Sequence, residues 1–189
     1  MEPATQPPTP DLGPYRHVLI PGFRCAVRVI GLLTKHQLRI RLGNRGARAR
    51  LPDGRELTVF RETTCDGGSL DGTVTLAVWF RLRAIPAGAR LRRHLFERES
   101  ILNSIIYAGF EGYRVKLWMV DPATSDYAGL YAWQGREAAA SYARYIATVL
   151  RPLSDPGSVG YAIVDASLDE YLDESGGTVR LDTTPHHRS

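Results

Sequence analysis

The hydrophobic pattern is clearest in the middle of the chain, where two runs rich in β-branched and aromatic residues flank a polar segment. These runs cover residues 113–120 and 127–133, and the segment between them contains Asp121, Pro122 and Asp126. Such an arrangement is typical of an antiparallel hairpin. Upstream, residues 73–83 alternate between apolar and other side chains, which predicts another strand.

Apolar residues recur at helical spacing in two further segments, 89–107 and 136–150. The second is followed by Pro152, which cannot continue a helix. Residues 158–165 read as a last strand. The order βαββαβ predicts an α+β protein of the ferredoxin-like class, with both helices on one face of a four-stranded antiparallel sheet.

The residues before position 73 are predicted to form an extension of this domain. We expect a helix over residues 22–35 and a β-meander of three short strands. A fragment of about 50 residues would be marginal alone, so we expect it to pack on the ferredoxin-like domain. The predicted organisation is a disordered proline-rich segment (1–14), the helix and β-meander extension (15–72), the ferredoxin-like domain (73–167), and an acidic, then polar, tail (168–189).

Composition indicates an ordinary globular protein, with 43% hydrophobic and 23% charged residues. Cys25 and Cys65 lie far apart and predict free thiols in a reducing compartment. The N-terminal sequence is not that of a signal peptide, and arginines interrupt the longest apolar stretch, so we expect a cytoplasmic protein.

The net charge of +4 is unevenly distributed, because residues 16–50 contain nine basic and no acidic residues. Such a segment can bind nucleic acid or an anionic membrane surface, but arginines can equally lie on solvated faces. We expect neither partner, and steeply salt-dependent association would contradict this expectation.

Alternation along the predicted strands indicates a face that combines aromatic and cationic side chains. If Val74, Val115 and Leu130 face the helices, all three tryptophans lie on the opposite face. So large an exposed aromatic patch must be covered, and we expect a second copy of the sheet to cover it in a homodimer. The enclosed space would suit a planar organic ligand, or the aromatic residues form only the dimer core. The residues of this predicted face are Trp79, Arg81, Arg114, Lys116, Trp118, Gly129, Tyr131 and Trp133.

Residues 73–165 resemble the YdhR-like monooxygenases of the dimeric α+β barrel superfamily, which includes the antibiotic-biosynthesis monooxygenases. The resemblance implies a homodimer and oxygenation of an aromatic or polyketide-like small molecule without metal or flavin. It rests on Phe110, Lys116 and Trp118, then on Gly129, Tyr131 and Trp133, and finally on Ala139 and Tyr142.

The resemblance and the predicted face together suggest roles for individual residues. Lys116 and Arg81 would stabilise a substrate enolate or phenolate, and Tyr131 would donate to an oxygen or relay a proton. A cyclase or isomerase would need the same cavity, and a non-catalytic dimer would need no chemistry. We expect no cofactor or metal, because His94, the candidate haem ligand, lies among arginines and is better explained as a solvated residue. The predicted substrate-binding residues are Trp79, Trp118, Trp133, Arg114 and Phe110.

Overall fold

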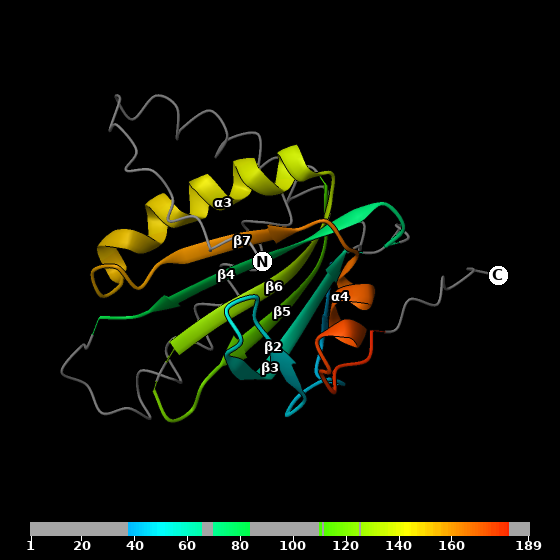
Figure 1. The fold of residues 1–189 in the computed structure, drawn as a ribbon, viewed down its shortest axis with the longest axis horizontal. Helices are drawn as coiled ribbons and strands as arrows, with labels where there is room; N and C mark the ends of the chain where they lie inside the picture. Colours follow the sequence, from blue (N-terminus) through cyan, green and yellow to red (C-terminus); the bar gives the residue numbers. More distant parts are fainter. Residues whose placement is uncertain (1–37, 66–69, 84–109, 111, 125, 182–189) are drawn as a thin grey trace.

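A computed structural model of the chain describes residues 38–65, 70–83, 110, 112–124 and 126–181. In this part seven strands form one sheet in the order β1-β3-β5-β6-β4-β7, with β2 also paired to β3 (Figure 1). Every pairing is antiparallel. The strands are β1 (Leu38–Arg41), β2 (Arg48–Arg50), β3 (Glu56–Cys65), β4 (Thr73–Arg81), β5 (Tyr113–Val120), β6 (Asp126–Gln134) and β7 (Gly160–Val164).

The predicted hairpin is confirmed as β5 and β6, which lie side by side in the middle of the sheet. The Asp121 side chain shapes the turn by accepting hydrogen bonds from the Ala123 backbone N–H at 2.8 Å and the Thr124 hydroxyl at 2.9 Å. β4 lies between β6 and β7, so the strands from β4 onward have the ferredoxin-like order, and this fold class is confirmed. The predicted helices over residues 22–35 and 89–107 lie outside the described residues.

Helix α3 (Arg136–Leu150) has the predicted bounds and covers one face of the sheet. It begins after Gly135, whose φ of 86° suits glycine, and a 3-10 turn containing Pro152 follows it. Its buried side chains pack against Leu76, Val78 and Trp133. No helix among the described residues is both long and apolar enough to cross a bilayer.

The strands before β4 continue the same sheet, because β3 pairs with β5 along most of its length. The predicted β-meander is wrong: β1 and β2 do not pair with each other but both pair with β3. The reason is that residues 43–46 loop out without reversing the chain, and the Gly46 N–H donates to the Val59 carbonyl at 2.8 Å. Only the turn at Pro52 and Gly54 reverses direction.

Helix α4 (Leu168–Glu174) lies in the segment predicted as an acidic tail and covers the other face of the sheet (Figure 1). Ser167 and Glu170 form a capping box at its start. Leu168, Tyr171 and Leu172 are buried at i, i+3 and i+4 spacing, a helical signal that the sequence analysis did not use. The Tyr171 hydroxyl donates to the Arg50 carbonyl at 2.7 Å and so ties α4 to β2.

Candidate functional site

The pairing register decides which side chains share a face with α3. Leu76 of β4 lies opposite Tyr131 of β6, and Tyr131 lies opposite Lys116 of β5. Directly paired residues point to the same face, so Lys116, Trp118, Tyr131 and Trp133 face α3.

The expectation that Val115 and Leu130 face the helix together with Val74 is therefore wrong. Val115 and Leu130 belong to the core under α4, whereas Val74 packs against the core under α3. Alternation fixes faces within one strand, but only the pairing register fixes the phase between neighbouring strands. Tyr131 and Trp133 of the predicted aromatic face pack against Tyr142 of α3 in the same chain, so the expectation that a second copy must cover these two residues is wrong.

Trp79 and Arg81 are not brought together with Lys116, because they point to the opposite face of the sheet. Arg81 instead holds the buried carboxylate of Asp126, with Nε at 2.6 Å and a terminal nitrogen at 3.0 Å. Arg55 adds a contact to the same carboxylate at 3.3 Å. The hydrogen bond from Arg81 lowers the pKa of Asp126 against the opposing effect of burial.

Lys116 lies against two aromatic rings and is only 4% exposed. Its Nζ lies 3.1 Å from the ring centroid of Trp118 and 4.7 Å from that of Tyr131. Burial, and after it the charge of Arg61, lowers the pKa of the Lys116 amine well below its ordinary value. The site therefore makes protonation of this amine less favourable than protonation of an exposed lysine.

Tyrosine and tryptophan side chains complete this arrangement on the side of α3. The hydroxyls of Tyr131 and Tyr142 lie 3.4 Å apart, and the rings of Trp133 and Tyr142 have centroids 4.9 Å apart. Burial raises the pKa of the Tyr131 phenol, so it remains a proton donor. Trp133 is fully buried, and its indole N–H has no hydrogen-bond acceptor within the described part of the chain. We refer to Lys116, Trp118, Tyr131, Trp133 and Tyr142 as the aromatic layer.

Strand β3 contributes to the aromatic layer, which the sequence analysis missed. The hydroxyl of Thr63 accepts from the indole N–H of Trp118 at 3.1 Å. The Thr63 carbonyl accepts from the Tyr113 hydroxyl at 2.8 Å. Only the pairing of β3 with β5 brings Thr63 here, and no local sequence signal predicts that pairing.

A β-bulge at the start of β5 interrupts the alternation of side chains between the two faces of the sheet. The register shifts between Tyr113 and Val115, so Tyr113 joins Trp133 on the α3 face, with ring centroids 5.8 Å apart. Arg114 occupies the bulge, half-buried, and its Nε has no hydrogen-bond partner among the described residues.

Two other predicted positions lie beside the aromatic layer. The ring of Phe110 packs edge-on against Tyr142, with centroids 5.4 Å apart. Gly129 leaves room for its neighbours, because a Cβ there would lie 2.7 Å from the Tyr131 ring and 3.0 Å from Cε of Lys116. Phe110 and Gly129 are both among the residues on which the family resemblance rests.

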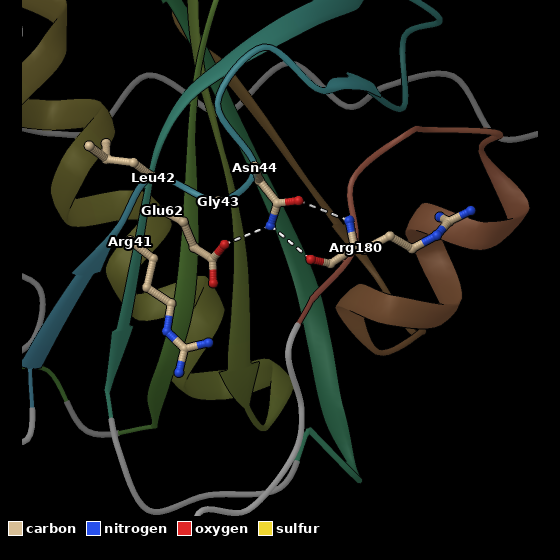
Figure 2. Close-up of a pocket in the computed structure, with 6 residues that line it drawn as sticks. All are labelled: Arg41, Leu42, Gly43, Asn44, Glu62 and Arg180. Carbon is tan, nitrogen blue, oxygen red and sulfur yellow. Dashed lines mark hydrogen bonds between the residues drawn. The ribbon is translucent and has the colours of Figure 1, made fainter.

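A separate pocket of about 530 Å³ lies between the loop at residues 43–46, β3 and the C-terminal segment (Figure 2). The Asn44 amide nitrogen donates to Glu62 at 2.7 Å and to the Arg180 carbonyl at 2.8 Å, and Asn44 accepts from the Arg180 N–H at 3.0 Å. These bonds fasten the C-terminal segment to the sheet. Glu62 is buried, on the face opposite Lys116.

The described residues contain no group of three or more histidine, cysteine, aspartate or glutamate side chains placed to hold a metal ion. His94 lies outside them.

Comparison with known proteins finds remote similarity to solved structures. No protein-family profile matches the sequence, and no curated protein matches it significantly. One similar solved structure is an uncharacterized ferredoxin-fold protein related to antibiotic biosynthesis monooxygenases from Listeria monocytogenes, with 14% identity and a TM-score of 0.39. The match covers 58% of this chain and 63% of that one. Another is a heme-degrading enzyme from the same organism, with 12% identity, a TM-score of 0.40, and coverage of 64% and 83%.

Proposed function

We propose that the protein is a cofactor-independent monooxygenase that acts on an aromatic or polyketide-like small molecule at the aromatic layer. The observation that carries this proposal is the amine of Lys116, buried against Trp118 and Tyr131. The YdhR-like subgroup and a homodimer are part of the same proposal, and light scattering of the purified chain tests the dimer.

The chemistry that we propose starts with proton transfer. The neutral amine of Lys116 takes a proton from an enol or phenol, and the resulting ammonium stabilises the substrate anion in surroundings of low dielectric. The anion gives an electron to dioxygen, and recombination forms a peroxide at carbon. Loss of water converts a CH₂ group and O₂ into a carbonyl and H₂O, so the substrate supplies all the electrons.

Aromatic residues would position the substrate ring and protect the intermediate. Trp118, Trp133 and Phe110 supply flat apolar surfaces, and closed aromatic surroundings exclude water from a reactive anion. The Tyr131 phenol, with its raised pKa, would donate a hydrogen bond to the substrate oxygen. Arg81 and Trp79, which lie on the other face, have no part in this mechanism.

Oxygen uptake tests the proposal, measured with a panel of polycyclic phenols and enolisable aromatic ketones such as anthrones. Once a substrate is found, Lys116→Met should lower turnover by about 100-fold or more, as expected for loss of a general base. Lys35→Met serves as the matched lysine control. Turnover that is unchanged in both Lys116→Met and Trp118→Ala would refute the mechanism.

The Tyr131–Tyr142 hydroxyl pair favours one alternative, a cyclase or isomerase reaction at the same residues. Such a reaction needs a proton donor and a proton acceptor but no oxygen. Conversion of a substrate under argon, at the rate seen in air, would favour this alternative over the oxygenase. Binding without conversion under either gas would identify a non-catalytic ligand-binding protein.

A further inference from the structure

The choice of lysine at position 116 is unusual for this chain. Of its 24 lysine and arginine residues only Lys35 and Lys116 are lysines, so the other 22 are arginines. A guanidinium stacks on aromatic rings at least as well as an ammonium does, and it keeps its charge at all ordinary pH values. What the amine can do, and the guanidinium cannot, is lose its proton and use the free electron pair.

The surroundings of Lys116 suit attack on a carbonyl carbon. The Nζ atom is held between the rings of Trp118 and Tyr131 on a central strand, so its position is fixed by the sheet. A Cβ at Gly129 would lie 3.0 Å from Cε of Lys116, so the lysine side chain packs directly against the backbone of β6 there. The hydroxyls of Tyr131 and Tyr142 provide proton donors nearby.

We propose that Lys116 binds aromatic aldehydes and ketones covalently, as an imine between its Nζ and the carbonyl carbon of the ligand. This rests on the proposed function in one respect, that an aromatic small molecule enters the aromatic layer. It adds the substrate class, an aromatic compound that carries a carbonyl group.

The step balances without any oxidant or reductant. The amine adds to the carbonyl to give a carbinolamine, which loses its hydroxyl group and one proton as water and leaves the C=N bond. Tyr131 and Tyr142 would pass the proton to the departing hydroxyl. Burial supports the first step, because an exposed lysine is neutral in only about one molecule in a thousand at pH 7.4, and desolvation increases that fraction.

Reductive trapping of the full chain tests the proposal. The protein is incubated at neutral pH with salicylaldehyde and cyanoborohydride, which converts an imine into a stable secondary amine, and the sites are mapped by peptide mass spectrometry. The chain's other lysine, Lys35, and the terminal amine serve as internal references. We expect trapping at Lys116 to exceed that at Lys35 by about tenfold or more, as for a desolvated amine nucleophile.

Two controls make a negative result informative. Lys116→Arg keeps a cation but cannot form an imine, so trapping should fall to the level of Lys35, whereas Lys35→Arg should leave trapping at position 116 unchanged. The same reaction on the denatured chain should label both lysines about equally and shows that both peptides are detectable. Labelling of Lys35 with none at Lys116 in the folded chain, or equal labelling of the two, would overturn the proposal.

The outcome is separable from that of the oxygenase proposal. Oxygen uptake that depends on Lys116, without imine trapping, would support the oxygenase proposal and refute the imine proposal. Selective trapping at Lys116, without oxygen uptake on any substrate, would support the imine proposal and refute the oxygenase proposal.

Discussion

Lys116 links the stability of the fold to pH. Its amine is buried against Trp118 and Tyr131, and this burial, with the guanidinium of Arg61 on β3, opposes protonation. A lysine whose folded pKa is lowered is protonated in the unfolded chain before it is protonated in the folded one. Between the two pKa values the unfolded state therefore binds more protons, and stability rises with pH.

We predict that the contribution of Lys116 to the free energy of unfolding rises with pH, up to the ordinary lysine pKa of about 10.4, because its folded pKa is lowered. The raised pKa values of Tyr113 and Tyr131 act in the opposite direction, but only above about pH 10, where tyrosines of the unfolded chain ionise. Urea titrations across this window should show the rise in the wild type and not in Lys116→Met. Parallel curves for the two proteins would contradict the assignment.

Gly129 offers a second test at the scale of one residue. A methyl group there would lie 2.7 Å from the Tyr131 ring, so Gly129→Ala must displace Tyr131 or Lys116. We predict a loss of about 1–3 kcal/mol in the free energy of unfolding, as for overpacked cores. Gly43→Ala is the matched control, because no atom lies within 4 Å of the added carbon there. Equal stability of the two variants would show that the layer is loosely packed.

At the scale of elements, the periodicity of the sequence predicted where helices and strands lie, but it did not predict how all the strands pair. The bounds of α3 and the β5–β6 hairpin follow from local patterns. By contrast, β5 and β6 are buried on both faces, so nothing in their sequences says which face receives α3. That is why Lys116 and Trp118 were correctly placed together, whereas Trp79 was placed with them wrongly. The bulge at Arg114 likewise has no local signal.

Helix α4 shows how a short element can stabilise a whole sheet face. Leu172 is 2% exposed in the core formed with β3, β5 and β6, whereas Leu153 is 57% exposed. We predict that Leu172→Ala lowers the free energy of unfolding by about 2–5 kcal/mol. Leu153→Ala should change it by no more than about 0.5 kcal/mol. Thermal and urea unfolding measure both, and a small effect of Leu172→Ala would mean that α4 contributes little.

On the scale of the whole molecule, the sheet is continuous across the boundary predicted near residue 73. The core under α4 joins Leu57 and Val59 of β3 to Leu117 and Met119 of β5. A fragment of residues 73–167 would lose both β3 and α4, and so would expose this core and leave the β5 edge unpaired.

We predict that this fragment does not fold on its own. It should lack a cooperative unfolding transition and the dispersed amide resonances of the full chain. Limited proteolysis of the intact protein should accordingly yield no stable product with these ends. A soluble, cooperatively folded fragment would show instead that residues 38–65 form a dispensable addition.

The division of the tryptophans between the two faces gives the molecule two optical reporters. Trp118 and Trp133 are buried on the face that packs against α3, whereas Trp79 is only partly buried on the face of α4, next to Arg55. A soluble quencher such as iodide should therefore reach the emission of Trp79 first and leave the blue-shifted emission of the other two. Changes in each fraction would report separately on events at the two faces of the sheet, without any attached label.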